Sequence, residues 1–189
     1  MQAIVAVSEN WGIGKDNDLL FHISADLKRF RELTAGQTVV MGRKTLESLP
    51  GGKGLPNRRN IVLTSNLDFK AENVETVCTA AGAVFAAGAD AFVIGGGSVY
   101  RQFLSMCDRV YVTKVFAHVE ADTFFPNLDE SPDWEVAEES EIMEENGIRF
   151  QYVDYIPVPQ EEDDDFLTTA APAEEFAPVG DVFSPFSGF

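Results

Sequence analysis

The carboxylate of Asp26 is the first candidate for chemistry, because it lies among apolar residues at helical spacing. Leu27 and Phe30 stand three residues apart and would share one face of a helix beside it. Ser24 is a candidate N-cap, which would place Asp26 in the first turn, where the helix dipole favours an anion. Two interpretations follow from this stretch alone: an acid that faces water, or a carboxylate at the bottom of a ligand pocket.

Two strand-to-helix junctions could bind phosphate. An apolar segment at 91–94 runs into Gly95-Gly96-Gly97, where three glycines let a pyrophosphate approach the main chain closely. A second segment runs into Gly42-Arg43-Lys44-Thr45, where basic side chains join the backbone N–H groups of a helix start. Neither junction matches the fingerprint G-x-G-x-x-G, so a tight structural turn and a solvated basic turn are the respective alternatives.

These residues need a layered scaffold. Apolar, β-branched segments predict strands at 3–7, 38–41, 60–65, 74–78, 91–94, 109–115, 133–139 and 148–156, and helices are expected at 24–34, 45–48, 79–88 and 98–104. Strand and helix alternate over the first two thirds, and Asn146-Gly147 indicates a hairpin turn near the end. The pattern predicts an α/β fold with a mixed sheet that ends in an antiparallel hairpin.

Two further segments suggest a binding edge. The segment 8–18 is rich in Gly, Asn and Asp, and its Gly12 and Gly14 suggest a tightly turning, mobile loop over a site, with an ordinary surface connection as the alternative. The strand at 60–65 ends in the hydroxyl residues Thr64 and Ser65. Ligands gather outside the carboxyl ends of strands in open α/β sheets.

The charge divides the chain unevenly. The net charge is −17, and the segment 157–189 holds eight acids and no base, which leaves −9 for residues 1–156. The pattern predicts one domain over 1–156 and an acidic, disordered tail over 157–189. An acidic surface argues against nucleic acids and anionic membranes as partners. The five tail phenylalanines leave open a recognition motif for an unknown partner around Phe183-Ser184-Pro185-Phe186.

Cysteine use and hydropathy indicate a cytoplasmic protein. Cys78 and Cys107 have no metal-type spacing, and we expect buried or half-buried free thiols and no metal site. The apolar runs are too short to cross a bilayer, and no signal segment precedes the strand at 3–7.

Six motifs then agree on one family. They are Trp11-Gly12-Ile13-Gly14, Ser24-Ala25-Asp26-Leu27-Lys28-Arg29-Phe30, Val40-Met41-Gly42-Arg43-Lys44-Thr45, Leu55-Pro56-Asn57-Arg58-Arg59-Asn60, Ile94-Gly95-Gly96-Gly97-Ser98-Val99-Tyr100 and Ala121-Asp122-Thr123-Phe124-Phe125-Pro126. In order and spacing they resemble dihydrofolate reductase of the bacterial type over about residues 1–156. The resemblance implies a central mixed, mostly parallel sheet flanked by helices. It also implies reduction of 7,8-dihydrofolate to 5,6,7,8-tetrahydrofolate with NADPH, in one-carbon metabolism.

The implied substrate site centres on Asp26. Its carboxylate would accept two N–H bonds from the pterin and favour protonation at N5 as hydride reaches C6, with water as the proton carrier. Thr113 is expected to hydrogen-bond Asp26, Phe21 to lie beside the water path, and Arg58 to clamp the glutamate α-carboxylate in a way that Lys could not copy. The implied lining of the pterin and aminobenzoate groove is Ile4, Val5, Ala6, Leu27, Phe30, Leu49, Leu55, Ile94 and Tyr100.

The implied cofactor site spans the two junctions and the loop at 8–18. Arg43, Thr64 and Ser65 would meet the adenosine 2′-phosphate and favour NADPH over NADH, and the Gly95-Gly96 peptide is cis in the family. The implied NADPH contacts are Ala6, Ile13, Gly14, Lys15, Asn17, Asp18, Leu19, Gly42, Arg43, Lys44, Thr45, Leu63, Thr64, Ser65, Ile94, Gly95, Gly96, Gly97, Ser98, Val99 and Tyr100.

Three residues depart from the family pattern. Many bacterial relatives have Pro-Trp where this chain has Leu20-Phe21, and Phe21 cannot hold a water as an indole nitrogen does, so proton delivery and the response to antifolates are open. Ser98 stands where some relatives place an arginine, which puts the NADPH preference in doubt. His22 is an additional titratable group, either on the loop surface or a proton donor.

Two other functions compete with this one. A pyrimidine reductase of riboflavin biosynthesis shares the fold and the cofactor, but the helix with Asp26 and Phe30, together with Arg58, recognises folate. The second alternative is an interaction protein that works through its acidic tail. The favoured interpretation is a monomer that binds dihydrofolate and antifolate inhibitors.

Overall fold

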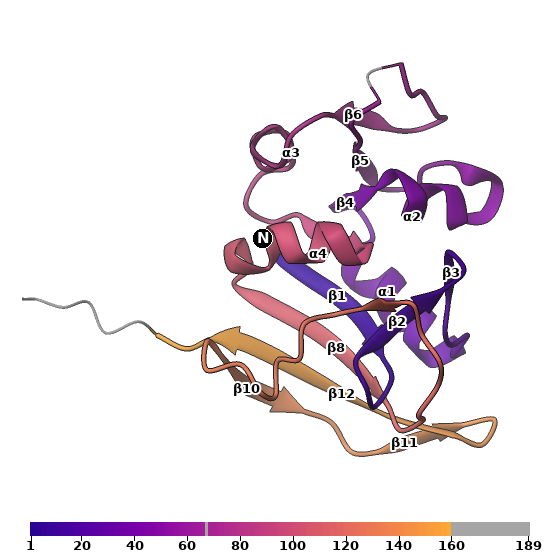
Figure 1. Ribbon diagram of the computed structural model, residues 1–189, viewed down its shortest axis with the longest axis vertical. Helices are drawn as coiled ribbons and strands as arrows, with labels where there is room; N and C mark the ends of the chain where they lie inside the picture. The colour runs from indigo at the N-terminus through magenta and orange to yellow at the C-terminus, as the bar shows by residue number, and fades with distance from the viewer. Residues whose placement is uncertain (67, 160–189) are drawn as a thin grey trace, which may run out of the picture. The chain divides into compact units, whose positions relative to one another are not determined.

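The central sheet carries most of the elements that position the site (Figure 1). Within residues 1–66 and 68–159, which the computed structural model describes, nine strands join in the order β10-β12-β8-β1-β7-β4-β5-β6, and β11 also pairs with β12. The strands are β1 Gln2–Val7, β4 Thr38–Gly42, β5 Arg59–Leu63, β6 Glu75–Val77, β7 Phe92–Gly95, β8 Arg109–Val115, β10 Trp134–Glu139, β11 Met143–Glu145 and β12 Ile148–Pro157. From β8 to β6 the neighbours are parallel, whereas β10, β11 and β12 are antiparallel. The predicted mixed, mostly parallel sheet with an antiparallel end is confirmed.

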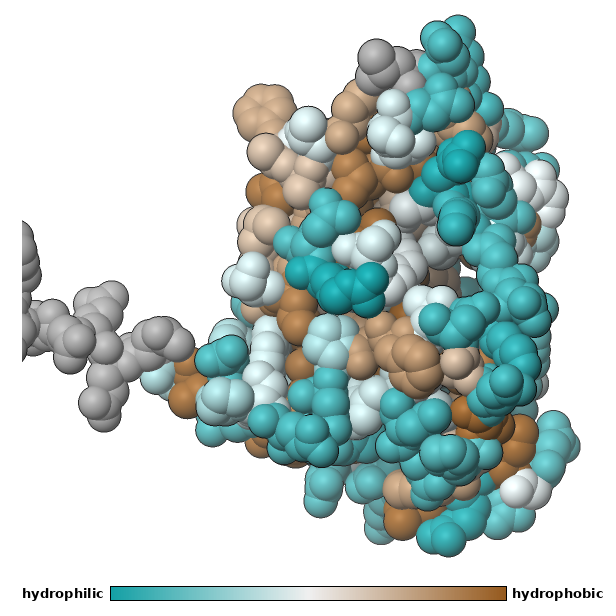
Figure 2. All heavy atoms as spheres, in the orientation of Figure 1, coloured by the Kyte–Doolittle hydropathy of each residue, from teal (hydrophilic) through white to brown (hydrophobic). Residues whose placement is uncertain are grey.

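Helices cover both faces of this sheet, because successive strand residues point to opposite sides. The helices are α1 Ser24–Thr34, α2 Arg43–Ser48, α3 Ala80–Ala87 and α4 Gly97–Phe103, with 3-10 turns at Pro50–Gly52 and Leu104–Met106. One face packs Val40, Ile61 and Val93 with Ala83, Val99 and Phe103 of α3 and α4. The other packs Val39, Met41 and Val62 with Leu46 of α2 and Phe30 of α1. The face of the molecule shown in Figure 2 is mostly hydrophilic, with hydrophobic residues in small separate groups.

The segment expected to be an irregular loop forms a small sheet instead. Strands β2 Gly12–Lys15, β3 Asp18–Leu19 and β9 Thr123–Phe124 pair in the order β3-β2-β9. The predicted tight turns at the two glycines are wrong, since both lie in β2 and the positive φ angles belong to Trp11 (59°), Asp16 (52°) and Asn17 (62°). Close packing explains Gly12, because a Cβ there would lie 2.6 Å from the Cβ of Ala121.

The hairpin turn at Asn146-Gly147 joins a pair of strands other than the predicted one. Both residues have positive φ angles, 53° and 78°, as a type I′ turn requires. The turn connects β12 to β11, a three-residue strand that the sequence pattern did not indicate, rather than to the strand at 134–139.

Part of the predicted organisation cannot be followed in the structure. The tail expected over 157–189, with its motif at Phe183-Ser184-Pro185-Phe186, lies outside the described residues apart from its first three residues. Among the helices that the structure does describe, none is both long enough and apolar enough to span a membrane.

Candidate active site

Asp26 is turned toward the sheet and not toward water. It lies in the first turn of α1, as predicted, and its Oδ1 accepts a hydrogen bond from the Thr113 hydroxyl of β8 at 2.6 Å. Thr113 is buried and Asp26 is half-buried. Burial raises the pKa of Asp26, while the bond from Thr113 and the charge of Arg29 act in the opposite direction. The geometry therefore fits a pocket carboxylate that holds a proton more readily than an acid in water.

The start of α1 is fixed from a distant strand. Ser24 was predicted as the N-cap, which is wrong: Ile23 holds that position and makes no side-chain cap bond, and Ser24 is the first helical residue. The carboxylate of Glu145 on β11 takes over this role, accepting from the backbone N–H groups of Ser24 at 2.7 Å and Ala25 at 3.0 Å. These two bonds lower the pKa of Glu145. A residue far along the chain therefore holds the helix end that carries Asp26.

The apolar residues predicted to line a groove come together only in part. Ile4, Phe30, Leu49 and Ile94 pack in one cluster on the α1 face of the sheet, whereas the side chain of Val5 packs on the opposite face. That placement leaves only the backbone of Val5 to face a groove beside Ile4. The remaining predicted lining residues lie at half-buried or exposed positions (Ala6, Leu27 and Leu55) or are buried (Tyr100). The Tyr100 hydroxyl donates to the carbonyl of Ile4 at 2.6 Å.

Arg58 lies at the far end of α1. Its Nε donates to the Thr34 hydroxyl at 2.8 Å, and a terminal nitrogen donates to the Pro56 carbonyl at 2.7 Å. Burial, and then the charge of Arg31, lower the pKa of Arg58. From Asp26 to Thr34 the helix rises about 12 Å at 1.5 Å per residue. The carboxylate of Asp26 and the Thr34 hydroxyl that Arg58 contacts therefore lie about two helical turns apart along α1.

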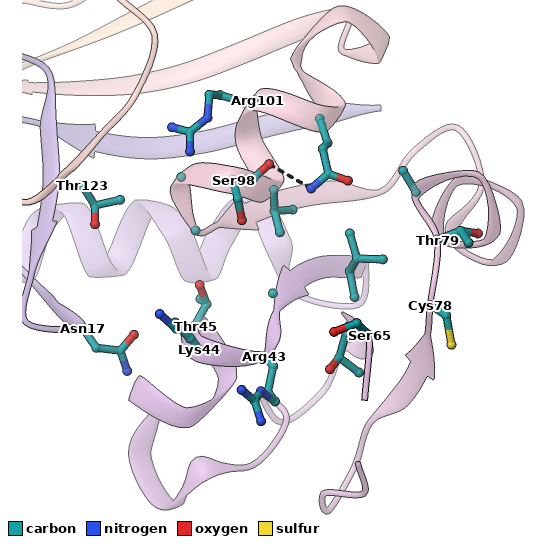
Figure 3. A pocket seen from close by; sticks show the side chains of 18 of the residues that line it. Asn17, Arg43, Lys44, Thr45, Ser65, Cys78, Thr79, Ser98, Arg101 and Thr123 are labelled. Carbon is teal, nitrogen blue, oxygen red and sulfur yellow. Dashed lines mark hydrogen bonds between the residues drawn. The ribbon is translucent and has the colours of Figure 1, made fainter. Parts of the chain in front are cut away.

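A polar cleft of about 740 Å³ lies between α2 and α4 (Figure 3). It collects most of the residues predicted for the cofactor: Asn17, Gly42, Arg43, Lys44, Thr45, Leu63, Thr64, Ser65, Gly96, Gly97, Ser98 and Val99. The other predicted contacts do not line it: Ala6, Ile13, Gly14, Lys15, Asp18, Leu19, Ile94, Gly95 and Tyr100. Helix α2 begins at Arg43, two residues earlier than predicted, so Arg43 and Lys44 stand in its first turn.

In the cleft, cationic side chains lie near two glycine-containing turns whose backbone packs closely against neighbouring residues. A Cβ on Gly97 would lie 2.8 Å from Thr123, so a side chain there would force a neighbour to shift, and one on Gly42 would make a tight contact of 3.1 Å with Val99. The peptide between Gly95 and Gly96 is cis. In Figure 3, Arg43 of α2 and Arg101 of α4 lie on different sides of the open space. The arrangement suits an extended anion such as a dinucleotide.

Several lining residues were not predicted. They are Cys78, Thr79, Ala80, Arg101, Gln102, Asp122, Thr123 and Phe124. Thr79 caps α3, accepting from the Gly82 N–H at 3.0 Å, and this strand-to-helix junction repeats the pattern of the other two. Cys107 is buried as expected, whereas Cys78 is exposed at the cleft. Asp122 accepts from the Asp16 N–H at 2.8 Å, which together with the Thr123 hydroxyl lowers the pKa of Asp122.

Comparison with known proteins agrees with this geometry. Residues 1–156 match the family model described as dihydrofolate reductase. The dihydrofolate reductase of Bacillus subtilis (strain 168) is 37% identical over 156 residues, covering 80% of this chain and 91% of that protein. The chain belongs to the dihydrofolate reductase family.

Other relatives of this reductase support the same assignment. The enzyme of Neisseria meningitidis serogroup B is 39% identical over 156 residues, covering 81% of this chain and 95% of that protein. A solved dihydrofolate reductase from Enterococcus faecalis, complexed with NADP(H) and RAB-propyl, is 37% identical with a TM-score of 0.74, covering 82% of this chain and 95% of that one. None of these relatives supports the alternative of a pyrimidine reductase.

Two of the residues that depart from the family pattern have clear surroundings in this reductase. Phe21 packs against the cluster of Ile23, Val115 and Phe150 near the start of α1. Ser98 is exposed on α4 at the cleft, one helical turn before Arg101. His22 is exposed. The positions of Phe21 and Arg101 bear on the two questions that the sequence left open, proton delivery and cofactor charge.

Proposed function

We propose that this dihydrofolate reductase binds the pterin of dihydrofolate at Asp26 and its glutamate carboxylate at Arg58, with NADPH in the cleft between α2 and α4. The observation that carries the proposal is the half-buried Asp26 carboxylate, held by Thr113 at 2.6 Å. That carboxylate shares α1 with Phe30, which packs in the apolar cluster that covers one face of the sheet.

The substrate site matches the chemistry of the ends of folate. A carboxylate accepts two parallel N–H bonds from the donor edge of a pterin, and its charge favours a protonated ring. Reduction at C6 requires a proton at N5, so this preference stabilises the reacting form of the substrate. We assign water as the proton carrier. Phe21, beside Ile23 and Val115, offers that water an apolar wall and no hydrogen-bond donor.

The cleft fits NADPH on its own residues. When bound, the cofactor supplies the hydride that reduces the pterin. We assign the phosphates to the backbone N–H groups at the starts of α2 and α4, and the 2′-phosphate to Arg43, Thr64 and Ser65, which line the cleft. We assign Tyr100 and Ile94 to the substrate side, because neither lines the cleft and Ile94 packs in the cluster on the α1 face.

We add Arg101 to this cofactor site. The Arg101 guanidinium reaches back along α4, with a terminal nitrogen 3.5 Å from the position of a Cβ on Gly97. Among the described residues it has no ion-pair partner, whereas Arg43 lies 3.6 Å from Glu47. Arg101 therefore supplies positive charge beside the phosphate turn where Ser98 supplies none.

We also propose that the reductase is a cytoplasmic monomer. Its cysteines, Cys78 and Cys107, are free, which suits a reducing compartment. A partner for the acidic tail remains a prediction from the sequence.

The direct test follows NADPH absorbance with purified full-length protein and dihydrofolate. We expect oxidation of NADPH that depends on dihydrofolate and is inhibited by antifolates. If NADPH absorbance stayed unchanged while fluorescence showed that NADPH binds, the proposed reaction would be rejected and the proposed cofactor site would stand. The tail variant lacking residues 160–189 is expected to retain full activity.

A further inference from the structure

A second charged cluster lies under α1, beside the pocket and outside the contacts assigned so far. Arg29 of α1 donates to one oxygen of Asp154 on β12 at 2.6 Å, and Arg109 of β8 donates to the other at 3.2 Å. The exposed fractions of the side chains are 17% for Arg29, 9% for Asp154 and 31% for Arg109. The cluster holds two cations and one anion, so it carries one net positive charge.

The strand register places this cluster next to Asp26. In the antiparallel β8–β12 ladder, Thr113 lies opposite Tyr152 and Tyr111 lies opposite Asp154. Residues two apart on a strand share a face, so these two pairs are neighbouring rungs on one side of the sheet. On α1, Asp26 and Arg29 are three residues apart and also share a face. Asp26 accepts a hydrogen bond from Thr113 of the first pair, and Arg29 donates one to Asp154 of the second pair.

Arg29 is held there more firmly than a surface arginine would be. Its guanidinium carbon lies 4.2 Å from the ring centre of Tyr152 and 5.5 Å from that of Tyr111, so both rings contact its faces. Its Nη1 is buried and has no hydrogen-bond partner within the described part of the chain. Burying part of a guanidinium without a partner opposes folding. An ion pair of Arg29 with Asp154 that served only stability would not require a buried Nη1 without a hydrogen-bond partner.

We propose that Arg29 is a positioning residue for dihydrofolate reduction, whose charge, fixed by Asp154 and Arg109, favours the carboxylate form of Asp26. The proposal rests on the role of Asp26 proposed above. It makes the cluster a source of positive potential for the pocket, supplied through the sheet face and not by direct contact with substrate. Burial disfavours the charged form of Asp26, and the positive charge of Arg29, three residues further along α1, opposes that effect.

The other groups around Asp26 do not provide this charge. Thr113 of β8 donates a neutral hydrogen bond. Tyr100 of α4 and Tyr152 of β12 are neutral, since burial raises the pKa of each. Glu145 of β11 is an anion that accepts from the backbone at the start of the helix, so it supplies no positive charge. Arg29 is therefore the cation that favours the carboxylate of Asp26.

The test is a carboxyl ¹³C NMR titration of Asp26 in the free enzyme, compared with the pH profile of kcat/KM. Arg29→Met removes the cation, and we expect the Asp26 titration midpoint to rise by about one pH unit. Asp154→Asn removes the anion and leaves both arginines, so the midpoint should fall. Arg29→Lys keeps the charge and should stay near wild type. The transition in kcat/KM should move in the same direction as the NMR midpoint in each variant.

Lys28→Met is the matched control. Lys28 is a neighbouring cation on α1, but its side chain is 73% exposed and pairs with Glu32 at 3.8 Å, facing solvent. We expect its Asp26 midpoint to be unchanged. An unchanged midpoint in Arg29→Met would overturn the proposal, as would shifts of the same sign in Arg29→Met and Asp154→Asn, because those indicate altered packing. The titration needs no turnover, so its result is separable from failure of the proposed function.

Discussion

Asp26 lies half-buried against Thr113, while the cations of the cofactor cleft, Arg43, Lys44 and Arg101, stand on two helices around open space. In the proposed substrate pocket, one carboxylate with a fixed partner would face one end of dihydrofolate, and the surrounding protein shifts the pKa of that carboxylate. In the proposed cofactor cleft, several side chains and backbone turns surround a different ligand, NADPH. Function in the pocket should therefore depend steeply on single residues, whereas affinity in the cleft should be spread over many.

The steepest dependence is expected at Asp26. Asp26→Asn keeps the shape of the side chain but removes the charge that favours a protonated pterin. We expect kcat near neutral pH to fall by at least about a hundredfold, with partial recovery at lower pH, where substrate is protonated in solution. Steady-state pH profiles check this.

The matched control is Asp68→Asn, an exposed acid outside both sites, which should behave as wild type. A near-normal rate in Asp26→Asn would remove the contrast between pocket and cleft, since the pocket would then have no single essential group.

An intermediate effect is expected at the other end of the groove. Arg58→Lys keeps the positive charge but loses the planar fork that holds a carboxylate with two bonds. We expect KM for dihydrofolate to rise about tenfold with little change in kcat, because the contact is the same in ground and transition states.

The neighbouring Arg59→Lys provides the comparison. Arg59 is exposed, and its Nε and one terminal nitrogen donate to the two carboxylate oxygens of Glu75, at 2.7 Å each. The KM of Arg59→Lys for dihydrofolate should remain at the wild-type value. Equal effects in the two variants would show that Arg58 acts through loop structure and not through substrate.

A smaller effect is expected in the cleft. Arg101→Gln removes one of three cations near the phosphates, and we expect the Kd for NADPH to rise about threefold to tenfold at low salt. The difference should shrink at high salt, because exposed charges are screened. Fluorescence titration with NADPH and NADH measures it, and Arg149→Gln, outside the cleft, is the control. A hundredfold loss would contradict the distributed character of this site.

The sequence predicted those parts of the fold and site that depend on local pattern. Strands such as β4 and β8, and the strand-to-helix turns at Gly42 and Gly95-Gly96-Gly97, follow from neighbouring residues alone. Strand β2 was missed because Gly12 pairs with Phe124, more than a hundred residues away. Arg101 carried one usable signal, a cation one turn beyond the glycine triad. The cluster of Arg29, Asp154 and Arg109 had none, because the register of β12 against β8 brings it together.

The smallest predicted effect concerns Glu145, another residue whose contact depends on strand pairing and not on local sequence. Glu145 lies 121 residues from Ser24 in sequence and holds the start of α1. Its pKa is lowered in the folded state, so its stabilising contribution is present above the ordinary glutamate pKa and is lost as pH falls through the lower folded value. We expect Glu145→Gln to lower the Tm by about 1–3 °C at neutral pH, and the difference to vanish in acid. Thermal melts from pH 3 to 7 measure this, with Glu144→Gln on the same strand as the control. If kcat of Glu145→Gln fell as far as in Asp26→Asn, Glu145 would be essential for turnover, as we expect of Asp26, and its role would not be limited to stabilising the start of α1.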